Sequence, residues 1–210
     1  MLSVTLTAVI LLGAFHGINP SMGWLFAVAR GLQERSRDLL LQSLPVIAFG
    51  HLASVAMVVV VVSITGSLVT STVLSIASGV LLVGFGLYHL LAKRHFRWVG
   101  MRVSLPQLAA WSFLMSSVHG AGLMLLPVLT HLPAATEAAG AHHHGGGALT
   151  GGMVVAGVHT LAMFVTATVV ALVVYEFAGL TILRRAWFNL DRMWAFALVA
   201  AGAITLATAW

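Results

Sequence analysis

The stretch LLGAFHGINPSM, residues 11–22, places a histidine and a helix-breaking pair inside a long apolar run. Pro20 lacks a backbone N–H and its ring clashes with the carbonyl four residues earlier, while Asn19 before it is disfavoured in the α region. The sequence therefore predicts a helix that is broken at Asn19-Pro20. At membrane depth, the backbone carbonyls of such an opened turn must line a cavity or bind something. We expect them to form a site together with the side chains of His16 and Met22.

The composition around this stretch is that of a membrane protein. Of the 210 residues, 60% are hydrophobic and 7% are charged, whereas an ordinary soluble domain has ~25% charged residues. So few polar side chains could not cover the surface of a soluble fold, which excludes a water-soluble enzyme. Because one bilayer crossing needs ~20 apolar residues, the chain has room for about six crossings. We expect one all-α transmembrane domain over residues 1–210, without enzymatic activity.

Apolar runs separated by short polar connections predict six transmembrane helices, at residues 3–29, 39–65, 69–92, 104–130, 152–179 and 193–210. All ten Lys and Arg residues lie in the first, third and fifth connections. Under the positive-inside rule these connections are cytoplasmic, so both termini face outward. We expect an integral protein of the inner, or plasma, membrane. The basic residues are Arg30, Arg35, Arg37, Lys93, Arg94, Arg97, Arg102, Arg184, Arg185 and Arg192.

The basic residues also bear on partners and processing. They fall in clusters between spans rather than on one amphipathic face, so we expect a lipid bilayer and no nucleic acid as partner. No Lys or Arg precedes Arg30, and a signal peptide needs a basic start, so we expect no cleavage. The spacing Gly13-x-x-x-Gly17 permits close helix contact, either within one protomer or in a homo-oligomer.

The chain contains an internal duplication. Each half, about 1–93 and 104–210, repeats the same small-residue and histidine motifs in its first, second and third spans. Because each half has three crossings, the halves enter the membrane from opposite sides. The pattern predicts a 3+3 inverted-topology repeat, an architecture of secondary transporters whose substrate site lies near the midplane. The matched motifs are His16-Gly17 with His119-Gly120, Gly50-His51 with Gly157-Val158-His159, and Ser78-Gly79 with Ala201-Gly202.

Histidines inside the spans form the candidate site. An ionisable side chain within the membrane is costly unless it faces a cavity or a partner. Imidazole suits nickel, cobalt, copper and zinc, and thioether sulfur suits Cu(I); with 0 cysteines, soft-metal chemistry must use His and Met. We expect the last of these histidines, His159, in the outer part of its span. The predicted metal site consists of His16, Asn19, Met22, His51, His119 and His159, with no tightly bound cofactor.

A second group of histidines lies outside the predicted spans. His142, His143 and His144 precede three glycines in the predicted external connection, residues 131–151. Such a tract captures a metal ion at the mouth of a path or acts as a low-complexity spacer. Because a glycine-rich segment imposes no fixed coordination geometry, we expect the tract to tune transport rather than to create it.

Two of these stretches resemble a known family. Residues 11–20, followed by Arg30-Gly31, and residues 50–54 are similar to the first two helices of the nickel/cobalt efflux permeases in the lysine-exporter superfamily. The resemblance implies a six-helix membrane fold and export of a metal cation. The family's first motif reads His-Gly-Leu-acid-Pro-x-His, and here Asn19 and Met22 stand in place of the acid and the second histidine. Loss of that charge and imidazole makes a softer ion such as copper an alternative substrate.

Two functions of other classes fit the same residues. The neutral Asn19 and Met22 are compatible with an exporter of amino acids or other small organic solutes. Paired histidines on neighbouring spans are also how haem-binding membrane electron carriers hold their iron. No nucleotide-binding motif is present in the sequence, so transport would be secondary, with histidine protonation as a coupling device.

The topology gives the first testable prediction. The chain has 0 cysteines, so Trp98→Cys and Gly145→Cys each introduce a single reactive thiol. Position 145 should react with a membrane-impermeant maleimide added to sealed cells, and position 98 should react only after permeabilisation. Labelling of position 98 but not of position 145 from outside would overturn the topology and the inverted repeat with it.

Overall fold

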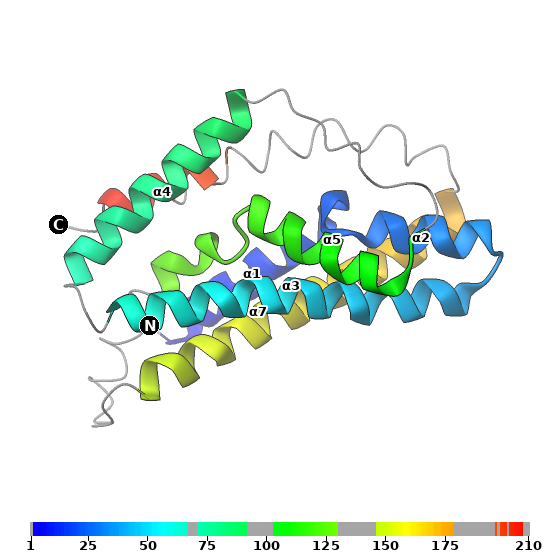
Figure 1. Ribbon diagram of the computed structural model, residues 1–210, viewed down its shortest axis with the longest axis horizontal. Helices are drawn as coiled ribbons and strands as arrows, with labels where there is room; N and C mark the ends of the chain where they lie inside the picture. The colour runs from blue at the N-terminus through cyan, green and yellow to red at the C-terminus, as the bar shows by residue number, and fades with distance from the viewer. Residues whose placement is uncertain are drawn as a thin grey trace.

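The computed structural model describes residues 2–66, 71–91, 103–129, 146–178, 196, 198–200 and 202–207. The regular structure in these ranges is helical, which confirms the predicted all-α class (Figure 1). Residues 198–200 and 202–207 are helical as well. The elements are α1 (Leu2–Ile18), η1 (Pro20–Met22), α2 (Trp24–Gln33), α3 (Arg37–Gly66), α4 (Ser71–Leu91), α5 (Leu105–Val118), η2 (Leu123–Leu125), α7 (Gly146–Val173) and the π-helical η3 (Val174–Ala178).

Two helices within these ranges are long and apolar enough to cross a membrane, namely Arg37–Thr65 of α3 and Leu149–Phe177 of α7 and η3. A third crossing is formed if the bent pair Leu105–Val118 and Leu123–Leu129 is one span. With its 30 residues, α3 is about 45 Å long, which exceeds the ~30 Å hydrocarbon core. Large apolar side chains such as Phe49 and Leu161 are exposed on these helices, as contact with lipid requires.

The predicted break in the first span is confirmed. Helix α1 ends at Ile18, and a 3-10 turn begins at Pro20. The Asn19 side chain accepts a hydrogen bond from the backbone N–H of Ser21 at 3.0 Å. Gly23 then adopts a φ of 113°, in the left-handed region that favours glycine, before α2 begins. The sequence thus supplies both the break and the residue that restarts the helix.

The backbone carbonyl groups at this break accept hydrogen bonds from within the protein, which was not expected. The carbonyl oxygen of Ile18 accepts a hydrogen bond from the Trp24 indole N–H at 3.2 Å. Those of His16, Asn19 and Pro20 accept hydrogen bonds from backbone N–H groups three residues ahead, at 3.1 to 3.2 Å. The expectation that the opened turn leaves these carbonyls for a ligand is therefore wrong, because the turn satisfies them itself.

A second break, which the sequence analysis did not predict, interrupts the fourth span after Val118. The backbone N–H of Ala121 donates to the carbonyl of Ser116 at 2.9 Å, and that of Gly120 donates to Ser117 at 3.1 Å. This pair of bonds is the Schellman motif, and Gly120, with a φ of 68°, occupies its left-handed position. The two halves of this span meet at 49°. Residues 104–130 are therefore not one straight helix.

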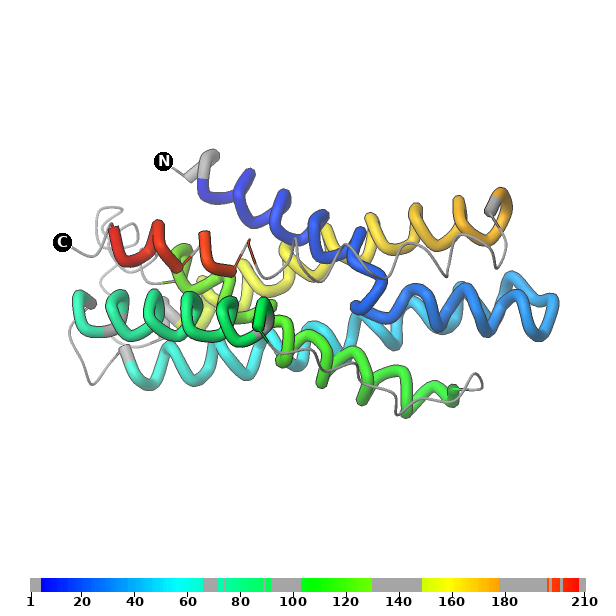
Figure 2. The backbone as a smooth tube through the Cα atoms, turned by 90° about the horizontal axis from the view of Figure 1, so that it is seen from above, coloured from blue at the N-terminus to red at the C-terminus, as the bar shows by residue number. Residues whose placement is uncertain are grey.

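Close helix contacts at glycines hold the bundle together (Figure 2). Helix α1 runs along α7, and a side chain at Gly13 would clash with the backbone carbonyl of His159. Helix α3 runs along α5, where a side chain at Gly50 would clash with the carbonyl of Ala109. The 202–207 segment packs on α4, since a side chain at Gly202 would meet the backbone of Val83. Small residues allow backbones to approach in this way in membrane bundles.

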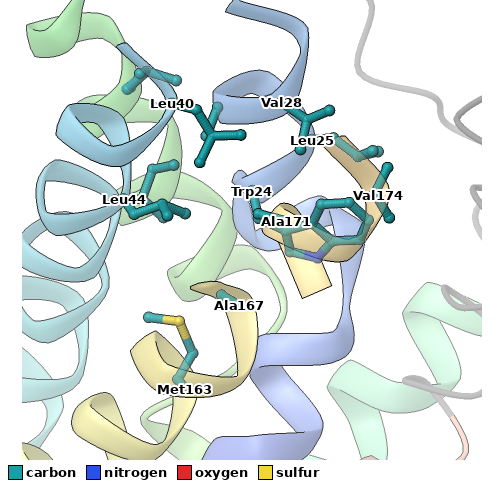
Figure 3. Close-up of a cluster of buried hydrophobic side chains, with 12 residues drawn as sticks. Trp24, Leu25, Val28, Leu40, Leu44, Met163, Ala167, Ala171 and Val174 are labelled. Carbon is teal, nitrogen blue, oxygen red and sulfur yellow. The ribbon is translucent and has the colours of Figure 1, made fainter. Parts of the chain in front are cut away.

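Buried apolar side chains gather at two levels of the bundle. One group, the basic-end cluster, lies where α2 and α3 carry Arg30 and Arg37 (Figure 3). The other, the far cluster, lies beyond it along α3 and α7. The basic-end cluster comprises Trp24, Leu25, Ala27, Val28, Leu40, Leu44, Ile47, Leu108, Met163, Ala167, Ala171 and Val174. The far cluster comprises Val55, Val59, Ala121, Leu125, Leu129 and Ala156.

The glycine contacts give a stability prediction. Gly13→Ala should destabilise the protein by about 1–3 kcal/mol, because the added methyl group meets a backbone carbonyl that cannot move aside. Gly157→Ala is the matched control, since a side chain there meets no atom within 4 Å, and alanine favours a helix. Thermal unfolding in detergent, followed by size-exclusion chromatography, measures both. Equal midpoints for the two variants would show that the contact between α1 and α7 is not tight.

Candidate functional site

Three histidines from three helices meet inside the bundle. The ring centroids of His16 and His159 are 4.8 Å apart, those of His51 and His159 are 5.4 Å apart, and those of His16 and His51 are 5.5 Å apart. Each of the three side chains has an exposed fraction of 0%. We call these residues the histidine triad. The structure thus brings together three of the six residues that were predicted to form the site.

The triad lies at the middle of the two long helices. His51 is residue 15 of the 30 in α3, counted from Arg37, and His159 is residue 14 of the 28 in α7, counted from Gly146. Helix α7 begins six residues before the predicted start at 152, so His159 lies nearer the middle of its helix than the predicted span placed it. His16 reaches the same level because Gly13, one turn earlier, lets α1 touch α7 at His159.

Backbone carbonyls fix how two of the histidines present their ring nitrogens. Nδ1 of His16 lies 2.8 Å from the carbonyl oxygen of Leu12, and Nδ1 of His119 lies 2.9 Å from that of Met115. A carbonyl can only accept, so Nδ1 carries the proton in both rings. In the neutral imidazole, Nε2 then keeps its lone pair, which is the arrangement found in metal-binding histidines.

Ser116 orients the third ring. Nδ1 of His51 lies 2.7 Å from the Ser116 hydroxyl oxygen, and that hydroxyl donates to the sulfur of Met22 at 4.0 Å. Because the hydroxyl hydrogen points to the Met22 sulfur, the hydroxyl oxygen accepts a hydrogen bond from the Nδ1–H of His51. Nε2 of His51 therefore keeps its lone pair. Met22 therefore contacts the triad through Ser116 instead of presenting its sulfur to the ring nitrogens. Ser116 is a site residue that the sequence analysis missed, because an unremarkable serine gains this role only through helix packing.

Several nitrogens of the triad have no hydrogen-bond partner among the described residues. These include Nε2 of His51 and both ring nitrogens of His159. A buried polar atom that lacks a partner costs about 1–3 kcal/mol. A bound cation, proton or water would satisfy these lone pairs, so the triad has the character of a binding site.

The ring spacing fits one metal ion, but the ring planes do not yet converge. Three imidazoles on one ion, with metal–nitrogen distances of ~2.0–2.1 Å, place their centroids about 5 to 5.5 Å apart. The observed spacing is similar, yet no group of three His or acidic residues in the described ranges has the geometry of a metal site. The planes of His51 and His159 differ by 19°, so their lone pairs lie in two stacked, nearly parallel planes and do not meet at one point. For these lone pairs to point at one ion, the ring of His51 or of His159 must rotate, whereas the helices can stay in place.

The remaining predicted residues lie around the triad or outside the described residues. Asn19 has an exposed fraction of 1%, and its side-chain nitrogen lacks a hydrogen-bond partner. His119 is buried at the C-terminal end of α5. The tract His142, His143 and His144 lies outside the described residues.

Apolar side chains close the triad from both directions. Along α3, Leu44 and Ile47 of the basic-end cluster precede His51, and Val55 of the far cluster follows it. Along α7, Ala156 of the far cluster precedes His159 by one turn. The triad is thus a polar layer between two apolar layers. A ligand reaches it only if one of these layers opens.

Comparison with known proteins adds no further assignment. No family model matches the chain, and no curated protein or solved structure is detectably similar to it. The resemblance to nickel/cobalt efflux permeases therefore depends on the two sequence motifs alone.

Ser116 gives a testable prediction. Ser116→Ala should weaken transition-metal binding roughly tenfold, as loss of a group that orients a metal-binding histidine does. Ser116→Thr keeps the hydroxyl and should restore most of the affinity. Ser117→Ala is the matched control, because Ser117 bonds to Ser54 and Phe113 instead of to the triad. Isothermal titration in detergent measures all three, and equal losses in Ser116→Ala and Ser117→Ala would contradict the role of Ser116.

Proposed function

We propose that the protein is a secondary membrane transporter that exports a transition-metal cation through the histidine triad. The observation that carries this proposal is the direct contact of three fully buried imidazoles from three helices, with ring nitrogens of His51 and His159 that lack partners among the described residues. Ionisable side chains at this depth in apolar helices are costly and mark substrate or ion pathways. A cation that binds all three rings repays that cost.

The proposed architecture has six spans in a 3+3 inverted repeat. This architecture is supported by two pairs of residues that the duplication matches and that lie next to each other in space. The rings of His51 and His159 stack, and a side chain at Gly79 would meet the carbonyl of Gly202. In an inverted repeat, matched residues near the pseudo-two-fold axis come together in this way. Each matched His-Gly pair also lies at a helix break, since His16-Gly17 directly precedes the end of α1 at Ile18 and His119-Gly120 directly follows the end of α5 at Val118.

Transport through this site requires alternating access. The basic-end cluster and the far cluster close the triad from opposite directions, so each must open in turn. In the proposed topology the basic-end cluster faces the cytoplasm of a plasma-membrane protein, and both termini lie outside. Protonation of the triad would displace a metal ion, which gives a means of coupling export to protons.

The contacts within the triad favour a metal ion over the two other candidate ligands. Haem held by two histidines requires a porphyrin between their rings, whereas the rings of the triad touch each other directly. An amino acid would need a partner for its carboxylate, and the triad presents nitrogen lone pairs, which repel an anion. We therefore do not propose these functions.

A double-mutant cycle tests the shared site. His16→Ala and His51→Ala should each remove most binding of Ag(I) or Ni(II), whichever the wild type binds more tightly, and the double variant should cost little more. Residues that hold one ion are non-additive in this way. Isothermal titration in detergent measures the four proteins, with His89→Ala, near the end of α4, as the control. Near-wild-type binding by His16→Ala would refute the shared site and return weight to the organic-solute exporter.

A further inference from the structure

The positions of the acidic residues bear on the charge of the cation that the triad can bind. The whole chain contains five acidic residues, Glu34, Asp38, Glu137, Glu176 and Asp191. The three within the described residues, Glu34, Asp38 and Glu176, lie at the end of the bundle that carries Arg37, and Glu176 pairs with Arg37 at 3.8 Å. The groups at the triad are imidazoles, the Ser116 hydroxyl and the Met22 thioether. All of these groups are uncharged when they bind a metal.

None of the described carboxylates lies at the triad, so an ion bound by the described groups keeps its full charge inside an apolar bundle. The cost of removing an ion from water grows with the square of its charge, so a divalent ion costs roughly four times as much as a monovalent ion of the same size. The last turns of α1 and α5 border the triad, and the C-terminal end of a helix carries only about half a negative charge. Two such ends balance about one positive charge, not two.

The coordination number points in the same direction. Zinc in proteins takes four ligands, and nickel takes at least four nitrogen or oxygen ligands. The triad supplies three nitrogens, and the residues about one turn away along α3 and α7 include the apolar side chains of Ile47, Val55 and Ala156. Monovalent ions with a filled d shell accept two or three imidazoles and need no further ligand. A site with three imidazole nitrogens therefore suits such a monovalent ion better than it suits zinc or nickel.

We propose that the substrate of this site is a soft monovalent cation, Cu(I), for which Ag(I) is a redox-stable analogue. This inference depends on the proposed function, because it names the substrate class of the same triad. Met22 also supports this assignment through its contact with Ser116. Its thioether accepts a hydrogen bond from the Ser116 hydroxyl, so all the groups that orient His51 are neutral.

Ion flux into proteoliposomes tests the proposal. Full-length protein is reconstituted, and accumulation of Ag(I), Ni(II), Co(II) and Zn(II) is measured by mass spectrometry, with nitrate salts in a non-coordinating, chloride-free buffer. Ag(I) should enter at least ten times faster than any divalent ion, and His51→Ala should abolish that difference. Faster flux of a divalent ion than of Ag(I) would overturn the monovalent assignment and leave the proposed transport function intact. Flux no greater than in empty liposomes for every ion would refute both.

A charge variant provides a second, independent readout. Asn19→Asp adds a carboxylate at a buried position near His16, and it should raise the flux of Ni(II) relative to Ag(I) at least fivefold. Gln42→Glu adds the same charge at an exposed position of α3 and should leave the ratio unchanged. If Asn19→Asp folds and leaves the ratio at the wild-type value, the charge of the ion does not determine selectivity, and the argument from missing carboxylates is wrong. The comparison of ions in the wild type stands whether or not this variant folds.

Discussion

The constraint on which the rest of this structure depends is that three imidazoles lie where water cannot reach them. Each ring of the histidine triad is fully buried between two apolar layers. Polar atoms in such surroundings must find partners within the protein or in a ligand. The Nδ1 atoms of His16 and His51 have protein partners. What remains are ring nitrogens of His51 and His159 that have no partner among the described residues, and a cation, a proton or water would satisfy them.

The two helix pairs that position the triad use different chemistry. Helices α1 and α7 touch through Gly13 and Gly17, where any side chain would collide with the opposite backbone. Helices α3 and α5 are joined by hydroxyl groups as well, since Ser112 donates to the carbonyl of Ile47 at 2.7 Å and Ser54 bonds to Ser117 at 2.8 Å. Glycine contacts set the distance between backbones, while hydroxyl groups also set the rotation of each helix. The second pair therefore determines the orientation of a side chain, which is what His51 requires.

Much of this arrangement could be predicted from the sequence, and the rest depended on packing. The break at Asn19-Pro20 is a local property of proline, and the structure confirms it. The break at Gly120 also has a local signal, a glycine directly after a helix, but an apolar sequence on both sides concealed it. The depth of His159 depended on where α7 begins, and helix ends are poorly defined in an apolar sequence. Ser116 could not be found from the sequence, because its partners His51 and Met22 are distant in the chain.

The placement of charge in this chain follows from the same constraint. Arg30, at the edge of the basic-end cluster, donates to the hydroxyl of Ser43 at 3.3 Å, and Ser43 in turn donates to the Leu39 carbonyl. The charged side chains thus lie at the edge of the basic-end cluster, where Arg30 bonds to a hydroxyl group and Arg37 to Glu176. Beyond that point the described polar groups are neutral histidines, hydroxyls and amides. A bundle built in this way tolerates a single positive charge at its centre only when several neutral donors surround it, and that is the condition the histidine triad meets.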